Sequence, residues 1–251
     1  MGVKKIVPCM DIKNGRVVKG TQFKDIEEVA DPVEMAKYYM ETGADELIFY
    51  DIQSSDESKP ILYDLICRVK AETSTPYIVG GGIQTMEDVD RVMDCGADRV
   101  SINSGVIKRP EFVSEVAAKY GSGKVILSVD VQMVDGVYRV FKNAGRVNTG
   151  IDALEWIKRG VGNGAGELVL NSIDTDGAKC GYDIPMLTAV SDMVDIPIVA
   201  SGGAGKFEDF LEVFKIKNVA AGLAARIFHY KEVNINELKQ YLRDNGVEVI
   251  L

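Results

Sequence analysis

Two kinds of segment alternate along the whole chain. Short apolar runs bounded by Gly, Asp or Asn are typical of buried strands, and the longer amphipathic stretches between them are typical of helices. Strands are predicted at 6–11, 47–52, 77–81, 99–103, 125–130, 168–173, 198–201 and 219–223. The predicted helices include 31–42, 86–95, 110–120, 151–160 and 207–215. Eight such units in 251 residues predict one (β/α)8 TIM-barrel domain over residues 1–251, with an open doubly wound sheet as the alternative.

The two halves of the chain also resemble each other. GADEL at 43–47 returns as GAGEL at 164–168, and PYIVGGG at 76–82 returns as PIVASGG at 197–203, each 121 residues later. A repeat of about half the chain indicates a barrel built from two similar half-barrels of four strands. Equivalent positions of the two halves would then lie across the mouth of the barrel from each other.

Asp11 ends the first predicted strand, and Asp130 ends the fifth, 119 residues later. Catalytic groups of barrel enzymes lie at the C-terminal ends of strands, so these two carboxyls are predicted to face each other over the mouth. One could act as general acid and the other as general base, provided that their surroundings separate their pKa values. Each could instead merely cap the helix that follows, but a symmetric pair favours catalysis.

Glycine-rich segments end the third and seventh predicted strands. Glycine lets a backbone approach an anion closely, and the N-terminus of the next helix favours negative charge. The segments are Gly80-Gly81-Gly82 and Ser201-Gly202-Gly203-Ala204-Gly205, and the following strands end in Asn103-Ser104-Gly105 and Ala224-Ala225-Arg226. Tight turns alone would also use such glycines. Two anion-binding cups beside two carboxylates predict a bisphosphorylated small-molecule substrate.

Composition argues against several other classes of protein. The formal net charge of −9 disfavours nucleic acid and anionic membranes as partners, and no apolar run approaches the length that crosses a bilayer. The four cysteines (Cys9, Cys67, Cys95 and Cys180) lack metal-type spacing and are expected to be reduced thiols of a cytoplasmic protein. His229 is the only histidine and is interpreted as a helix-end residue. No metal ion or other cofactor is therefore predicted.

The sequence leaves alternative roles for further residues near the predicted mouth of the barrel. Lys19 could reach the substrate or could be an ordinary solvated lysine. Asp174 and Asp176 could each form a turn or contact substrate. Tyr50 is assigned to the core or the rim.

Longer segments of the chain are recognisable when they are taken together. They are PCMD at 8–11, GRVVKG at 15–20, DPVE at 31–34, VGGGI at 79–83, VSINS at 100–104, VD at 129–130, NTG at 148–150, GAGE at 164–167, DG at 176–177, GYD at 181–183, ASGGAG at 200–205 and IFH at 227–229. With these segments the chain resembles, over nearly its whole length, the cyclase subunit of imidazole glycerol phosphate synthase, an enzyme of histidine biosynthesis.

The resemblance implies a specific reaction. Ammonia would attack phosphoribulosyl-formimino aminoimidazole carboxamide ribonucleotide, and the products would be imidazole glycerol phosphate and aminoimidazole carboxamide ribonucleotide. The catalytic aspartates of the family fall on Asp11 and Asp130. Its phosphate contacts fall on Gly82, Asn103, Ser104, Asp176, Gly177 and Gly203.

The resemblance also implies a partner. Members of the family receive ammonia along the barrel axis from a glutaminase (glutamine amidotransferase) subunit docked on the opposite face. The charged gate of that face falls on Lys5, Glu46, Arg99 and Glu167. From the residues alone, charges at the starts of strands would be interpreted as a stabilising salt-bridge ring, and both interpretations can hold.

Four positions depart from the family pattern. An acid, Glu27, stands in the substrate-covering loop where a cation is usual. Gln53, with Ser54 and Ser55, replaces Thr-Ala-Ser, Thr175 replaces an arginine, and Arg226 replaces a serine where it could bind phosphate directly. These departures concern the exact substrate rather than the fold or the style of reaction.

Three alternatives remain open from the sequence. A paralogous barrel could use channelled ammonia to form an amidine in surface-sugar biosynthesis, or a related sugar-phosphate isomerase could share the two aspartates. A catalytically silent barrel that only activates a glutaminase is the alternative from another class.

Overall fold

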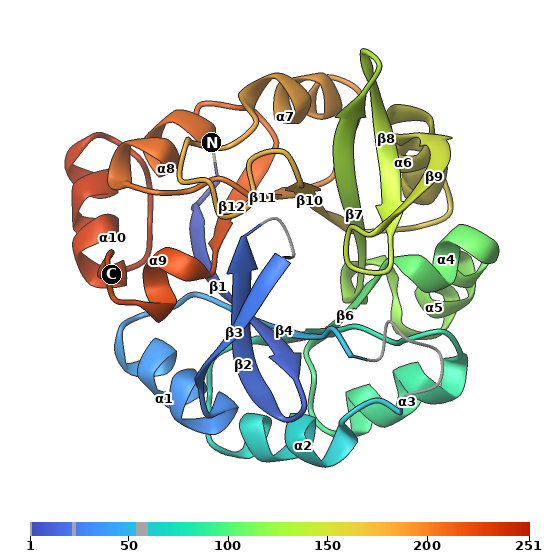
Figure 1. Cartoon of the computed structure of the whole chain (residues 1–251), viewed down its shortest axis with the longest axis horizontal. Helices are drawn as coiled ribbons and strands as arrows, with labels where there is room; N and C mark the ends of the chain where they lie inside the picture. The colour runs from blue at the N-terminus through green and yellow to red at the C-terminus, as the bar shows by residue number, and fades with distance from the viewer. Residues whose placement is uncertain (1, 22–23, 54–59) are drawn as a thin grey trace.

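A closed barrel of eight parallel strands forms the centre of the computed structural model, which describes residues 2–21, 24–53 and 60–251 (Figure 1). The strands are β1 (Lys5–Lys13), β4 (Leu47–Asp51), β5 (Tyr77–Gly80), β6 (Arg99–Ile102), β7 (Val125–Val134), β10 (Glu167–Ser172), β11 (Ile198–Ser201) and β12 (Val219–Ala224). Parallel pairing of β7 with β10 and of β12 with β1 closes the sheet. The predicted barrel is thereby confirmed, and the open sheet is wrong.

Helices alternate with the strands and surround the barrel (Figure 1). They are α1 (Pro32–Glu41), α2 (Tyr63–Ala71), α3 (Met86–Asp94), α4 (Ser104–Lys108), α5 (Phe112–Tyr120), a 3-10 turn (Ser122–Lys124), α6 (Ala153–Gly162), α7 (Ile184–Ser191), α8 (Phe207–Val213), α9 (Arg226–His229) and α10 (Ile235–Asp244). Asp31 caps α1 by accepting hydrogen bonds from the backbone N–H groups of Val33 and Glu34. The helix predicted at 151–160 begins only at Ala153, because Asp152 ends a strand and caps α6.

Two antiparallel hairpins at the pocket end of the barrel were missed from the sequence. β2 (Arg16–Thr21) and β3 (Lys24–Ala30) continue from β1, and β8 (Val137–Lys142) and β9 (Val147–Asp152) continue from β7. The turns at Asn14-Gly15 and Asp135-Gly136 have positive φ at both residues, which is the usual signal of a tight hairpin. The half-barrel repeat thus extends to a hairpin after each strand that carries a predicted catalytic aspartate.

The alternation of side chains along the strands divides the core into two layers. On β1, Ile6 and Met10 pack outward with the helices, whereas Val7 and Cys9 point into the barrel. We call the inner layer the axial core; it consists of Val7, Cys9, Ile48, Ile78, Ile126, Val169, Val199, Ala221 and Leu223. Asp11 continues the inward-facing row of β1, which places its carboxyl above the axial core.

The expectation of four reduced cysteines is wrong. Cys67 on α2 and Cys95, the residue that ends α3, form a disulfide with their Cα atoms 4.5 Å apart. Cys9 and Cys180 are free. The two bonded residues are 28 positions apart in the sequence, and only the side-by-side packing of α2 and α3 brings them together.

Candidate active site

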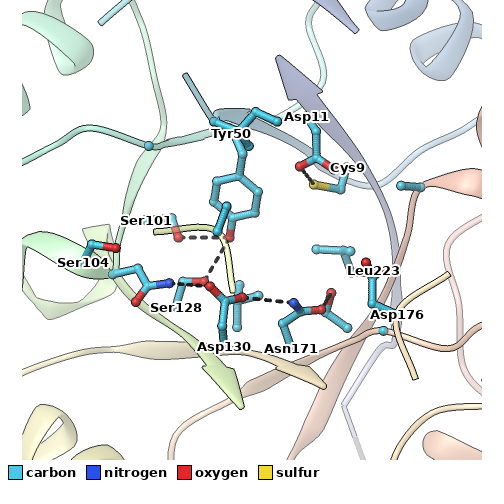
Figure 2. A pocket seen from close by; sticks show the side chains of 18 of the residues that line it. Cys9, Asp11, Tyr50, Ser101, Ser104, Ser128, Asp130, Asn171, Asp176 and Leu223 are labelled. Carbon is cyan, nitrogen blue, oxygen red and sulfur yellow. Dashed lines mark hydrogen bonds between the residues drawn. The ribbon is translucent and has the colours of Figure 1, made fainter. Parts of the chain in front are cut away.

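A cavity of about 430 Å³ opens at the C-terminal ends of the barrel strands, a size typical of small-molecule sites. All predicted catalytic and substrate-binding residues line it: Asp11, Lys19, Gly82, Asn103, Ser104, Asp130, Asp176, Gly177, Ser201, Gly203 and Arg226. Figure 2 shows Asp11 and Asp130 on opposite sides of this pocket. The structure therefore brings together residues that are spread over the whole sequence.

Asp11 lies beside a buried cation. The Lys19 ammonium is 3.7 Å from Asp11 Oδ2 and 3.4 Å from Asp176 Oδ1, and the Lys19 side chain is only 8% exposed. The alternative of a solvated Lys19 is therefore wrong. Burial raises the pKa of Asp11, while the neighbouring Lys19 charge opposes that rise. Cys9 completes this side of the pocket, with its thiol directed at Asp11 Oδ1 over 4.0 Å.

Asp130 has a different environment, made of amides rather than cations. Asn103 donates from Nδ2 to Asp130 Oδ2 at 2.9 Å, and Asn171 donates from Nδ2 to Asp130 Oδ1 at 3.0 Å. Ser201 donates to the Asn171 Oδ1 atom at 2.9 Å, which orients the Asn171 amide. Burial raises the pKa of Asp130 to about 6, although the two amide hydrogen bonds oppose this rise. The two carboxyls are thus chemically distinct, as an acid–base pair requires.

The first predicted anion-binding cup lies between β5 and α4. Gly82 has a φ of 70°, so its backbone adopts a conformation that favours glycine, and Asn103 and Ser104 lie at the start of α4. Ser104 Oγ accepts a 3.1 Å hydrogen bond from the backbone N–H of Asn143, which ties the β8–β9 hairpin to the cup.

The second predicted cup lies between β11 and α9. A Cβ on Gly203 would lie 2.0 Å from the carbonyl oxygen of Gly181, so this glycine also serves close backbone packing. A structural role of this glycine is therefore confirmed, and anion binding stays a prediction. Arg226 begins α9 with its guanidinium 5.4 Å from the ring centre of Tyr230.

Several residues of the pocket were missed from the sequence. Lys142 on β8, Lys179 and Asn171 line it, as do Tyr50 and Ser128 from inside the barrel. Asn171 could have been found, because it is a polar residue inside the apolar strand predicted at 168–173, and the structure pairs it with Asp130. Lys142 could not, because nothing local indicates that its hairpin folds back over the pocket.

Two buried oxygen atoms at the pocket lack a hydrogen-bond partner within the described part of the chain. They are Oδ1 of Asn103 and Oδ2 of Asp176. Buried polar atoms are normally paired, so these two oxygens are available acceptors for N–H or O–H groups of a bound molecule.

The four predicted gate residues form a chain of ion pairs at the other end of the barrel. The Lys5 ammonium lies 2.5 Å from Glu46, and Arg99 pairs with both Glu46 and Glu167. Burial raises the pKa of Glu167 against the opposing charge of Arg99. The salt-bridge interpretation of these residues is confirmed; their action on ammonia remains a prediction.

The departures from the family pattern occupy ordinary polar environments. Glu27 is exposed on β3, Gln53 accepts a hydrogen bond from the backbone N–H of Asn14 at 2.9 Å, and Thr175 donates to the Ser172 carbonyl at 3.4 Å. Ser54 and Ser55 lie outside the described residues.

His229 ends α9, as predicted. It is buried, and its Nδ1 shares a 2.5 Å hydrogen bond with the Tyr39 hydroxyl. Burial lowers the pKa of His229 to about 3, so the ring is neutral at ordinary pH. Among residues 2–21, 24–53 and 60–251 there is neither a metal-holding group of three His, Cys, Asp or Glu side chains nor a helix able to span a membrane.

Fold and site together define a class: a (β/α)8-barrel enzyme whose pocket holds two unlike carboxyls. The chain belongs to the histidine biosynthesis protein family, whose sequence model matches residues 5–234.

Similar proteins agree over the full length of the chain. It is 49% identical to the imidazole glycerol phosphate synthase subunit HisF of Oceanobacillus iheyensis, covering 99% of this chain and 98% of that protein. HisF of Hydrogenobaculum sp. is 48% identical, covering 99% of both chains, and HisF of Halalkalibacterium halodurans is 45% identical, covering 99% of this chain and 100% of its own. The expected cyclase function in histidine biosynthesis is thereby confirmed, and such a subunit belongs to a synthase complex with a partner subunit.

Proposed function

We propose that the pocket catalyses the attack of ammonia on phosphoribulosyl-formimino aminoimidazole carboxamide ribonucleotide, with Asp11 and Asp130 as the acid–base pair. The single observation that carries this proposal is the pairing of two buried carboxyls with unlike surroundings in one cavity. The products are imidazole glycerol phosphate and aminoimidazole carboxamide ribonucleotide.

Asp130 is the general base. Both of its oxygens accept amide N–H groups, from Asn103 and Asn171, and such bonds favour the ionised form. A carboxylate whose pKa lies near 6 is still ionised at neutral pH and is a stronger base than an ordinary aspartate. Asp11, on the opposite side of the same pocket (Figure 2), then takes the complementary role of general acid.

The two glycine-rich cups hold the two phosphates of the substrate. Gly82, Asn103 and Ser104 form one site. Gly177, Gly203 and Arg226 form the other, and Ser201 lies beside them. Although the chain carries a net charge of −9, Lys19, Lys142, Lys179 and Arg226 all line the pocket, which supports an anionic ligand.

Ammonia comes from a glutaminase subunit bound at the opposite end of the barrel, in a cytoplasmic complex. The ion-paired residues Lys5, Glu46, Arg99 and Glu167 surround the entrance to the axial core, so a change in their pairing would open or close that entrance. Their partial burial supports this role. A partly buried charged side chain that loses its ion-pair partner finds few other partners, so these four residues depend on one another.

The test is turnover of the bisphosphate substrate by the purified protein with an ammonium salt. We expect the parent to be active and Asp11→Asn and Asp130→Asn to lose at least a hundredfold in kcat. Asp135→Asn, in the exposed turn after β7, is the matched control and should keep full activity. A folded parent without turnover would contradict the substrate assignment and favour the surface-sugar paralogue.

A further inference from the structure

Tyr50 lies where the axial core meets the pocket. It is on β4, its Cα is paired with that of Asp11 on β1, and its ring packs against the axial core from the pocket side. Its side chain also lines the cavity. The ring thus lies on the boundary that a small molecule crosses when it passes from the axial core into the pocket.

The surroundings of the ring hold it in one position. A Cβ on Gly80, the residue paired with Tyr50 on β5, would lie 2.6 Å from Tyr50 Cε1, so the strand provides space for the ring only by having glycine there. The hydroxyl makes a 3.1 Å hydrogen bond with Ser101 Oγ and donates to Ser128 Oγ over 3.5 Å. Figure 2 shows the hydroxyl pointing to the side of the pocket that carries Ser128 and Asp130.

The chemistry of this hydroxyl suits a neutral amine rather than an ion. A phenol that donates its proton to Ser128 accepts the hydrogen of Ser101, and its oxygen can still accept one further, weaker hydrogen bond from an N–H group. Burial raises the pKa of Tyr50 above its usual range, so the group stays uncharged at ordinary pH. An uncharged acceptor binds ammonia without favouring its protonation, which would remove the lone pair needed for attack.

We propose that Tyr50, oriented by Ser101 and Ser128, binds ammonia as it leaves the axial core and holds it beside Asp130. This inference rests on the proposed function, because it requires ammonia to be the nucleophile. It adds a binding site for that nucleophile, separate from the two phosphate cups.

The experiment compares the parent with Tyr50→Phe, which keeps the ring and removes only the hydroxyl. Initial rates are measured against ammonium at saturating bisphosphate, and against bisphosphate at saturating ammonium, at one pH. We expect kcat/KM for ammonia to fall about three- to tenfold, the effect of one hydrogen bond, with KM for the bisphosphate unchanged. A general loss of packing would change the kinetic constants for both substrates, not those for ammonia alone.

Two further variants complete the test. Ser128→Ala removes the acceptor of the Tyr50 proton and should lower kcat/KM for ammonia in the same direction, whether or not Tyr50→Phe folds. Tyr63→Phe is the matched control, because that hydroxyl donates to Asp88 at 2.8 Å between α2 and α3, and neither residue lines the pocket. It should leave both KM values unchanged.

The outcomes separate the two proposals. An active parent whose ammonia kinetics are unchanged or improved in Tyr50→Phe and in Ser128→Ala would overturn the role of Tyr50 alone. A parent that is inactive with ammonium would overturn the proposed function, and the ammonia site with it.

Discussion

Asn171 donates a hydrogen bond from Nδ2 to Asp130 Oδ1 at 3.0 Å, and the Cα atoms of the two residues are direct partners in the pairing of β7 with β10. The bond therefore depends on the same register that closes the barrel. It links the geometry of the fold to the protonation of the proposed general base.

Asn171→Ala should raise the pKa of Asp130, because the lost amide bond favoured the ionised carboxylate. In the parent, kcat should fall as the pH drops through about 6, where Asp130 becomes protonated. In the variant this acidic limb should move upward by about one pH unit. A pH–rate profile measures it, with Asn218→Ala, whose amide bonds the backbone of Ser191 and Val194, as the control. An unmoved limb would show that Asp130 does not control it.

Asp130→Asn should be more stable than the parent at pH 7, although it should lose activity. Because the pKa of Asp130 is raised from 3.8 to about 6, the folded state binds more protons than the unfolded state between these values. Stability is therefore lost as the pH rises through this window, by up to about 3 kcal/mol. Urea unfolding should give the variant an advantage of about 1–2 kcal/mol at pH 7 that disappears near pH 4. An equal difference at both pH values would contradict the prediction.

Arg99→Met should destabilise the barrel by about 3 kcal/mol, because it leaves the mostly buried carboxylates of Glu46 and Glu167 without their shared cation. Lys5→Met is the matched comparison. Its side chain is 39% exposed and, within the part of the chain that the structure describes, pairs with Glu46 alone, so its removal should cost far less. Adding Glu167→Gln to Arg99→Met should recover part of the loss. Similar denaturation curves for Arg99→Met and Lys5→Met would argue against a structural role of the Arg99 pairs.

The disulfide between Cys67 and Cys95 predicts a thiol count. The denatured, unreduced protein should titrate two thiols, those of Cys9 and Cys180, and the reduced protein should titrate four. Reduction should lower the free energy of unfolding by about 3 kcal/mol, because the bond restricts the unfolded chain between α2 and α3. A Cys67→Ala/Cys95→Ala variant should have the stability of the reduced parent and be insensitive to reductant. Four thiols before reduction would show that the bond does not form in solution.

The sequence by itself determined the barrel and the ends of strands that carry its chemistry. Strand and helix periodicities are local properties of the chain, so all eight barrel strands were predicted, most with bounds within two residues of those observed. Asp11 and Asp130 were found because each is an acid at the end of an apolar strand, and the pattern repeats in both halves of the chain. Such a pattern can be recognised in the sequence alone. The segments shared with the family then predicted which substrate the pocket would bind.

Only the tertiary structure decided which side chains meet. Lys19 looked like a possible surface lysine until the β2–β3 hairpin placed it between Asp11 and Asp176. Tyr50 was assigned to the core or the rim until closure of the barrel placed its hydroxyl beside Ser101 and Ser128. Cys67 reached Cys95 only through helix packing. The physical reason is the same in each case. Burial, charge pairing and pKa depend on neighbours that are distant in the sequence, and the closing of the barrel determines those neighbours.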